Sequence, residues 1–92
     1  MQIEWTVKAL IDVDRLHAFL SQYDREAAAA IVLRLDAAPA RLIANSRLGE
    51  RVDNFAPREV RKLSVGRYVM HYEIMRDRIS ILRVWHARED RS

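Results

Sequence analysis

The most constraining feature of this sequence is a pair of β-rich runs near its C-terminal end, separated by a short polar link. The runs are Tyr-Val-Met-His-Tyr-Glu-Ile at 68–74 and Ile-Ser-Ile-Leu-Arg-Val-Trp-His-Ala at 79–87, and the link is 75–78. Alternating aromatic and β-branched runs joined by a short link predict a β-hairpin at the centre of a small sheet. The charged residues that follow are expected to be presented to a partner.

The second of these runs is apolar on both of its predicted faces. Ile79, Ile81 and Trp85 fall on one face, and Leu82 and Val84 fall on the other. Such a strand is either central in its sheet or covered on its second face by another element. Because the sequence supplies only two helices, we expect a partner protein to cover Leu82 and Val84.

The N-terminal half of the sequence predicts a strand followed by a helix. Residues 2–9 alternate between apolar and polar positions, which is typical of a half-buried strand. After these residues the apolar side chains recur at the spacing of a helix, and we predict that Asp12 or Asp14 is its N-cap. The residues expected to face inward from the strand are Ile3, Trp5 and Val7.

Asp24 is placed to cap a second helix, and a tight link makes the two helices an antiparallel hairpin. Proline inside a helix removes one hydrogen bond and clashes with the preceding turn. The helix either ends near Ala37 and restarts or bends at Pro39, and we predict a kinked helix that runs to about Ala44. Residues 50–57 have no clear period and are predicted to be a loop.

A short strand is predicted over 58–65, with Val60 and Leu63 inward, before the turn into the hairpin. The predicted order is therefore β-α-α-β-β-β, an α+β fold in which a helical hairpin packs on a mainly antiparallel sheet. The 92 residues form a single domain, 1–92. We see no signal peptide, no membrane-span run and no cysteine, so we expect a cytoplasmic protein without disulfides or thiolate metal sites.

Positive charge is concentrated in the second half of the chain. Residues 1–46 carry five basic and six acidic side chains, whereas 47–92 carry eleven basic and seven acidic ones. Fourteen of the sixteen basic residues are arginine, whose planar fork suits carboxylates and phosphates. This composition favours an acidic partner or nucleic acid and does not choose between them.

No catalytic or metal-binding constellation stands out, and we expect no cofactor and no metal. His86 ends the second β-rich run, where a side chain is held by the sheet yet exposed at its edge, which suits recognition or acid–base chemistry. Several basic residues are predicted to converge at one end of the sheet, where they would bind phosphate or an acidic peptide. They are Arg61, Lys62, Arg67, Arg83, Arg88 and Arg91.

The run from Val65 to Ile74, followed by Ile79 to Asp90, resembles the C-terminal half of RelE/ParE toxins of type II toxin–antitoxin systems. Upstream, 42–49 is similar to the helix end and "P-R-L-G" stop of that family, with Ser46 in place of the proline, and 58–63 matches the strand that follows. The resemblance spans nearly the whole chain and implies the same element order.

Two branches of that family have different activities. RelE-like members cleave mRNA in the ribosome and typically carry an arginine directly after the first hairpin tyrosine, where this chain has Val69. The ending from Arg83 to Asp90 resembles the ParE branch, which poisons DNA gyrase, and we favour that branch. One alternative is a ribosome-dependent mRNA endonuclease, and another is an antitoxin-binding module whose toxic activity has decayed. The nuclease candidates would be Arg61, Lys62, His86 and Arg88.

The resemblance to the ParE branch implies a ParD-like antitoxin as partner, in a hetero-oligomeric complex. It also implies no membrane contact, and contact with operator DNA only through the antitoxin. The residues expected to contact the target are Arg83, Trp85, His86, Arg88 and Arg91. Those expected to contact the antitoxin are Leu16, Leu20, Arg34, Arg67, Leu82 and Val84.

Overall fold

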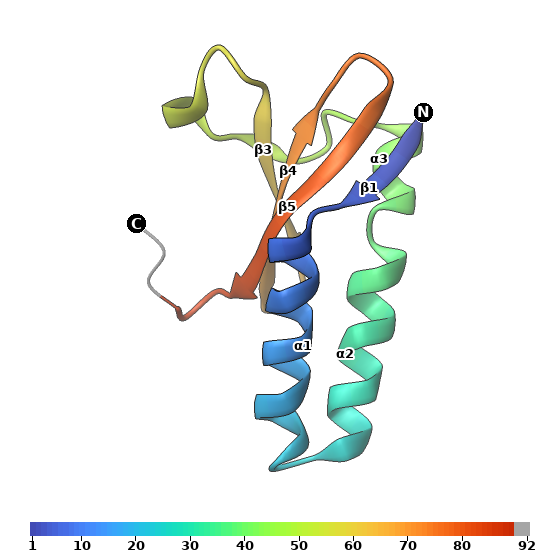
Figure 1. The fold of residues 1–92 in the computed structure, drawn as a ribbon, viewed down its shortest axis with the longest axis vertical. Coiled ribbons are helices and arrows are strands. Elements are labelled where there is room, and N and C mark those ends of the chain that lie inside the picture. Colours follow the sequence, from blue (N-terminus) through green and yellow to red (C-terminus); the bar gives the residue numbers. More distant parts are fainter. Residues whose placement is uncertain (90–92) are drawn as a thin grey trace.

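One mixed β-sheet carries the fold, and a pair of helices covers one of its faces (Figure 1). The structure is a computed structural model that describes residues 1–89. In chain order its elements are β1 (Gln2–Trp5), α1 (Val7–Ser21), α2 (Arg25–Ala37), α3 (Ala40–Ala44), β2 (Glu50–Arg51), the 3-10 turn η1 (Asp53–Phe55), β3 (Val60–Val65), β4 (Tyr68–Ile74) and β5 (Arg78–His86). The α+β class and the predicted order are confirmed, with α3, β2 and η1 as additions.

The strands lie in the order β1-β5-β4-β3-β2. β1 runs parallel to β5 and the other neighbours are antiparallel, so the sheet is mainly antiparallel as predicted. β4 and β5 form the predicted hairpin, and β5 is a central strand because β1 pairs with its other edge. The prediction of a plain loop over 50–57 is wrong, because Glu50 and Arg51 pair with β3 and a 3-10 turn follows.

Helix α1 begins earlier than predicted, at Val7, and its N-cap is Thr6. The Thr6 hydroxyl accepts a first-turn backbone N–H at 3.1 Å and donates to the Leu82 carbonyl at 2.9 Å. The predicted strand over 2–9 therefore ends at Trp5. The alternating pattern continued past Trp5, but threonine is a favoured N-cap and its two hydrogen bonds start the helix here.

We predicted that Asp12 or Asp14 would be the N-cap of this helix, and neither is. Asp12 lies inside α1 and is only 3% exposed. Its carboxylate accepts two hydrogen bonds from the Arg83 guanidinium, at 2.8 and 3.1 Å, and one from the Val84 backbone N–H at 2.9 Å. β1 ends opposite Ile81, so it offers no backbone acceptor to the part of β5 beyond that residue, and Asp12 provides one instead. A buried backbone N–H needs an acceptor, and Asp12 supplies one.

The second helix begins as predicted, with Asp24 as the N-cap of α2. The prediction of a single helix kinked at Pro39 is wrong, because α2 ends at Ala37 and α3 begins at Ala40. Pro39 keeps helical angles, with φ −61° and ψ −21°. It has no backbone N–H, however, and its ring obstructs the preceding turn, so the helical hydrogen-bond ladder is interrupted there.

A β-bulge decides which side chains of β5 face the helices. In the pairing of β5 with β4, Leu82 is the extra residue. The alternation shifts by one position there, so Ile79 and Val84 enter the same core beneath the helices. The prediction that Val84 needs a partner to cover it is wrong, since it is fully buried by the chain itself. Trp85 is moved by the same shift to the opposite face, which we call the outer face.

The core lies between the helical hairpin and the covered face of the sheet, and Leu35, Met70 and Tyr72 are fully buried in it. Tyr72 also fixes the connection that follows α3. Its hydroxyl donates to the Ser46 carbonyl at 2.8 Å and accepts the Gly49 N–H at 2.9 Å. Gly49 approaches β3 so closely that a Cβ would lie 2.5 Å from a backbone oxygen, and no larger residue fits there.

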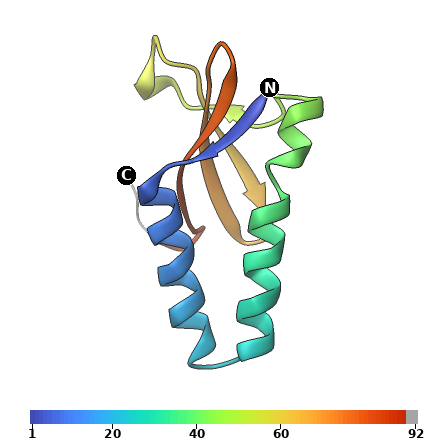
Figure 2. The same ribbon diagram turned by 45° about the vertical axis from the view of Figure 1, so that its right-hand side comes forward.

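The helical hairpin is longer than the sheet that it covers. In Figures 1 and 2 the turn between α1 and α2 lies well beyond the end of the sheet formed by the start of β4 and the end of β5. The part of α1 nearest that turn therefore has a side that the sheet does not cover. Phe19 in this part of α1 is 59% exposed, and Tyr23 in the turn that follows the helix is 74% exposed.

Replacing Asp12 should destabilise the fold much more than replacing the exposed Asp14 on the same helix. Asp12→Ala leaves the Val84 N–H and the Arg83 guanidinium without their acceptor, and because Arg83 is partly exposed we expect a loss of about 2 kcal/mol. Urea unfolding measures this, and the melting temperature should fall by about 10 °C. Asp14→Ala removes an exposed carboxylate from the same helix and should cost less than about 0.5 kcal/mol. Equal losses for the two variants would contradict the role assigned to Asp12.

Candidate functional site

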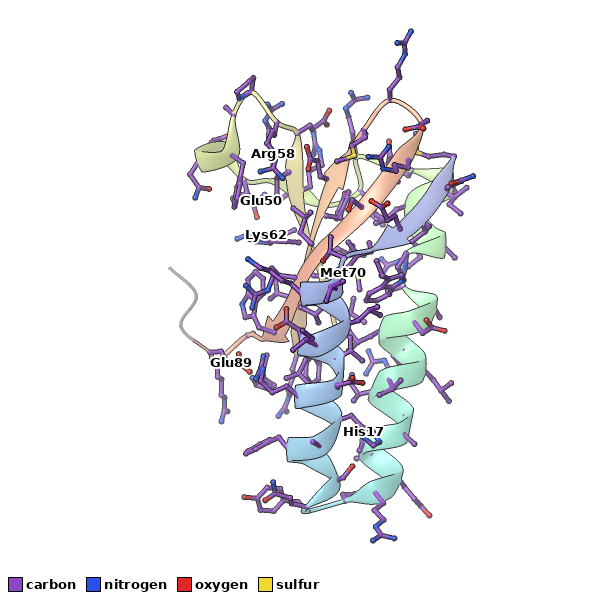
Figure 3. The ribbon with its side chains drawn as sticks, in the orientation of Figure 1. His17, Glu50, Arg58, Lys62, Met70 and Glu89 are labelled. Carbon is purple, nitrogen blue, oxygen red and sulfur yellow. The ribbon has the colours of Figure 1, made fainter. Side chains whose placement is uncertain are left out.

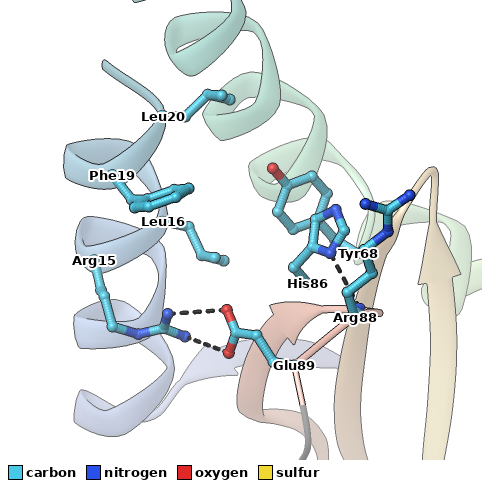
Figure 4. Close-up of a pocket in the computed structure, with 8 residues that line it drawn as sticks. All are labelled: Arg15, Leu16, Phe19, Leu20, Tyr68, His86, Arg88 and Glu89. Atoms are coloured by element: carbon cyan, nitrogen blue, oxygen red, sulfur yellow. Dashed lines mark hydrogen bonds and ion pairs between the residues drawn. The ribbon is translucent and has the colours of Figure 1, made fainter. Parts of the chain in front are cut away.

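A groove of about 750 Å³ lies where the helical hairpin projects past the end of the sheet. Figure 4 shows side chains of α1 on one side of it, facing residues of the sheet on the other. The lining residues are Arg15, Leu16, Phe19, Leu20, Tyr68, His86, Arg88 and Glu89. Most of this lining is apolar, and the charged groups lie at its edge.

Helical periodicity builds the first wall of the groove. Leu16, Phe19 and Leu20 are spaced i, i+3 and i+4, so they lie on the same side of α1. Leu16 is buried, at 5% exposure, and ties α1 to the core, whereas Phe19 is 59% exposed. This wall therefore combines a fixed base with an accessible aromatic surface.

The sheet supplies the second wall. Tyr68 at the start of β4 pairs with His86 at the end of β5, and their rings meet edge to face with centroids 5.1 Å apart. His86 Nδ1 accepts the Arg88 backbone N–H at 3.1 Å. The Glu89 N–H donates to the His86 carbonyl at 2.9 Å, so a compact turn follows the strand.

An ion pair joins the two walls at the edge of the groove. Arg15 Nη1 and Nη2 lie 3.0 and 3.2 Å from the two carboxylate oxygens of Glu89 (Figure 4). Arg15 Nη2 also lies 4.0 Å from Asp12 Oδ1. The Arg15 and Glu89 side chains are 42% and 29% exposed. Solvent screening therefore limits the contribution of this pair to about 1 kcal/mol or less.

Three further arginines at this end of the sheet, Arg34, Arg67 and Arg88, form no ion pair with another residue of 1–89. The Arg34 guanidinium packs over Gly66 in the β3–β4 turn, where a Cβ would lie 2.8 Å from its Nη2. The Arg67 carbonyl accepts the Ala87 N–H at 2.8 Å, which holds that turn against the segment after β5. Positive charge that no acidic side chain of the described residues pairs therefore lies next to the groove.

Four of the six residues expected to contact an antitoxin lie at this end of the molecule: Leu16, Leu20, Arg34 and Arg67. The two leucines line the groove and the two arginines lie at the β3–β4 turn. The other two residues lie elsewhere. Leu82 is half-buried at the bulge, and Val84 is inside the core.

The five residues expected to contact the target do not form one surface. His86 and Arg88 line the groove. Trp85 belongs to the outer face, because it pairs with Val69 of β4 rather than with a core residue, whereas the Arg83 guanidinium is held by Asp12 of α1. Arg91 lies outside the described residues.

The structure separates the four candidate nuclease residues Arg61, Lys62, His86 and Arg88. The Arg61 guanidinium is held by Glu59 at 3.0 Å and by the Gly49 carbonyl at 2.7 Å. Lys62 points to the other face of β3 and lies 3.8 Å from Glu50 (Figure 3). Metal-independent RNA cleavage needs cations and a base around one phosphate, and these four side chains do not surround one position.

The outer face carries a ring cluster that the sequence analysis did not identify: Phe55, His71 and Trp85. The His71 ring meets both partners edge to face, with centroid distances of 6.1 Å to Phe55 and 4.4 Å to Trp85. Burial lowers the pKa of His71 below its ordinary value of 6.5, and the charge of Lys62, its cross-strand partner, lowers it further. Phe55 comes from η1, in a segment without periodicity, so no sequence signal placed it.

Sequence reasoning also missed four lining residues of the groove: Arg15, Phe19, Tyr68 and Glu89. Periodicity places Phe19 on the apolar side of its helix and Tyr68 in a β-rich run, but it does not show that Phe19 is exposed and Tyr68 only half-buried. Arg15 and Glu89 are separated by 74 positions in the sequence. Only the fold brings these two side chains together.

Within residues 1–89, no three histidine, cysteine or acidic side chains are grouped so as to hold a metal ion. Over the same residues, none of the helices combines the length and apolar character needed to cross a lipid bilayer.

Two comparisons with known proteins match this architecture. A family model described as the ParE toxin of the type II toxin–antitoxin system parDE matches residues 3–91. A solved structure described as a chromosomal ParDE toxin–antitoxin system from P. aeruginosa superposes with a TM-score of 0.79 and 24% identity, covering 94% of this chain and 95% of that chain. At that identity the likeness establishes the shared fold. A comparison with curated proteins gives no match.

The lowered pKa of His71 predicts a pH-dependent stability. The unfolded chain binds a proton at this residue near pH 6.5, whereas the folded chain resists protonation there, so stability should fall as the pH falls through that range. Urea unfolding across this range measures the loss. His71→Gln should flatten the profile, whereas His17→Gln, at an exposed position on α1, should not. A His71→Gln profile as steep as that of the wild type would contradict this origin of the pH dependence.

Proposed function

The chain belongs to the ParE toxin family of type II toxin–antitoxin systems, and from this premise we propose that an acidic, amphipathic segment of a cognate antitoxin neutralises it by binding in the groove. We further propose that the free toxin acts on DNA gyrase in the cytoplasm. The antitoxin is of the ParD-like type. The complex is a hetero-oligomer, and its contacts with operator DNA are made by the antitoxin.

The observation that carries the antitoxin proposal is an apolar groove next to three arginines, Arg34, Arg67 and Arg88, that form no ion pair within residues 1–89. An amphipathic helix binds such a groove by placing its apolar side chains at i, i+3, i+4 and i+7 against it. Phe19 is more than half exposed in the free chain, and covering it should contribute about 1–2 kcal/mol. The half-buried Leu20 and Tyr68 extend the same apolar surface.

Charge supports an acidic rather than a basic or neutral segment. Arg34, Arg67 and Arg88 have no ion pair within the described chain, so acidic side chains of a partner gain attraction without breaking an existing pair. The net charge of the chain, +3, acts in the same direction at longer range. Such complementarity mainly raises the association rate and the selectivity for the partner.

Gyrase as the target is supported by family membership and by the separation of the candidate nuclease residues. A gyrase poison needs a contact surface and does not need cations gathered around a scissile phosphate. Trp85 offers such a surface on the outer face, whereas His86 and Arg88 lie in the groove and the Arg83 guanidinium is held by Asp12 of α1. An antitoxin in the groove would cover His86 and Arg88 and so block target contacts made there.

A charge placed in the groove should prevent antitoxin binding. Phe19→Glu puts a carboxylate on the apolar wall and should weaken the affinity for the purified antitoxin by at least about tenfold. Leu33→Glu makes the same change at a position of similar exposure on α2 that is not part of the groove lining, and should leave the affinity unchanged. Titration calorimetry on both folded variants measures this. Equal affinities for Phe19→Glu and the wild type would exclude the groove as the binding site.

The purified chain should inhibit DNA supercoiling by gyrase, or trap gyrase–DNA cleavage complexes, in proportion to its concentration. A molar excess of the antitoxin should reverse the effect. Absence of any effect at every ratio of chain to gyrase would overturn the gyrase assignment. Primer extension on translated mRNA after induction gives the complementary result, because codon-linked cuts would support the endonuclease instead.

A further inference from the structure

Arg15 lies at the edge of the groove, beside the apolar surface of α1. Arg15 and Phe19 are spaced i, i+4 on α1, so the guanidinium lies one turn from the exposed aromatic ring on the same side of the helix. Figure 4 shows this guanidinium at the edge of the apolar surface, with its fork directed at Glu89. The planar fork is the geometry that binds a carboxylate through two hydrogen bonds.

Glu89 reaches Arg15 from the other wall of the groove. Its backbone is positioned by the turn after β5, in which its own N–H donates to the His86 carbonyl. Its side chain remains 29% exposed, and that of Arg15 remains 42% exposed. A pair with this much solvent contact exchanges partners easily, because neither group is buried when the contact opens.

Only one carboxylate of the described residues makes a two-pronged contact with the Arg15 guanidinium. Asp12 is already engaged by Arg83 through two hydrogen bonds and lies 4.0 Å from Arg15. Glu89 is the acidic group that directly matches the Arg15 fork. If Glu89 moves away, the guanidinium at the edge of the groove is open to another carboxylate.

From this geometry we infer that Arg15 is the carboxylate-binding residue of the groove, and that Glu89 occupies its fork in the free chain until an acidic side chain of the antitoxin replaces it. The inference rests on the proposed function, because it assigns a specific contact to the antitoxin that the groove is proposed to bind. Antitoxin binding then releases the segment after β5, which carries Arg88, from α1. The toxin's own C-terminal segment thus competes with its inhibitor.

Removing the internal competitor should strengthen antitoxin binding. The experiment uses the full chain and a full-length antitoxin, obtained by coexpressing this chain with the reading frame next to its gene and then separating the two proteins. The dissociation constant is measured by titration at low and at high salt. Glu89→Gln should tighten binding about threefold at low salt, with a smaller gain at high salt. Arg15→Gln should weaken binding about fivefold, and adding Glu89→Gln to Arg15→Gln should give no further gain.

Glu50→Gln is the matched control, because it makes the same charge change at an exposed ion pair that does not line the groove. It should leave the affinity unchanged. Unchanged or weaker binding by Glu89→Gln, a gain that persists without Arg15, or an equal gain from Glu50→Gln would each overturn the inference. Failure of the wild-type chain to bind the antitoxin would instead overturn the proposed function.

Discussion

The buried carboxylate of Asp12 holds the two layers of this fold together. β1 covers the edge of β5 only as far as Ile81, and beyond that point Asp12 provides the acceptor for Val84 N–H. The hydrogen bonds from Arg83 hold the carboxylate in place, and they raise the pKa of the Arg83 guanidinium above its ordinary value. Because Asp12 belongs to α1, this contact also sets how far the helix runs along the sheet.

The groove follows from that placement. With α1 fixed to the middle of β5, its last turns extend past the end of the sheet and leave Phe19 partly uncovered opposite Tyr68. Glycine in the β3–β4 turn then allows Arg34 to pack closely over it, since Gly66 has φ +60° and no side chain. The molecule therefore presents two different surfaces: an apolar groove next to arginines that have no ion pair within the described residues, and an outer face where His71 packs between aromatic rings.

Patterns of short range were predictable from the sequence, and contacts of long range were not. The hairpin, the cap at Asp24 and the central position of β5 followed from periodicity and local propensity. The bulge at Leu82 leaves no mark in the sequence pattern, yet it moves Val84 into the core and Trp85 to the outer face. Leu16 and Leu20, expected from the sequence to contact an antitoxin, both line the groove, but Arg15 and Glu89 meet only in the folded chain. The role of Asp12 was missed for the same reason, because its partners lie more than 70 positions away.

The central claim, that the groove rather than the outer face receives the antitoxin, is tested most directly by residue-resolved amide hydrogen exchange. The free chain would be compared with the chain saturated by purified antitoxin. Binding in the groove predicts that protection increases in the second half of α1, around Leu20, and at the start of β4, around Tyr68. Amides near His71 and Trp85 should exchange as they do in the free chain. New protection at His71 and Trp85, with none around Leu20, would contradict the account.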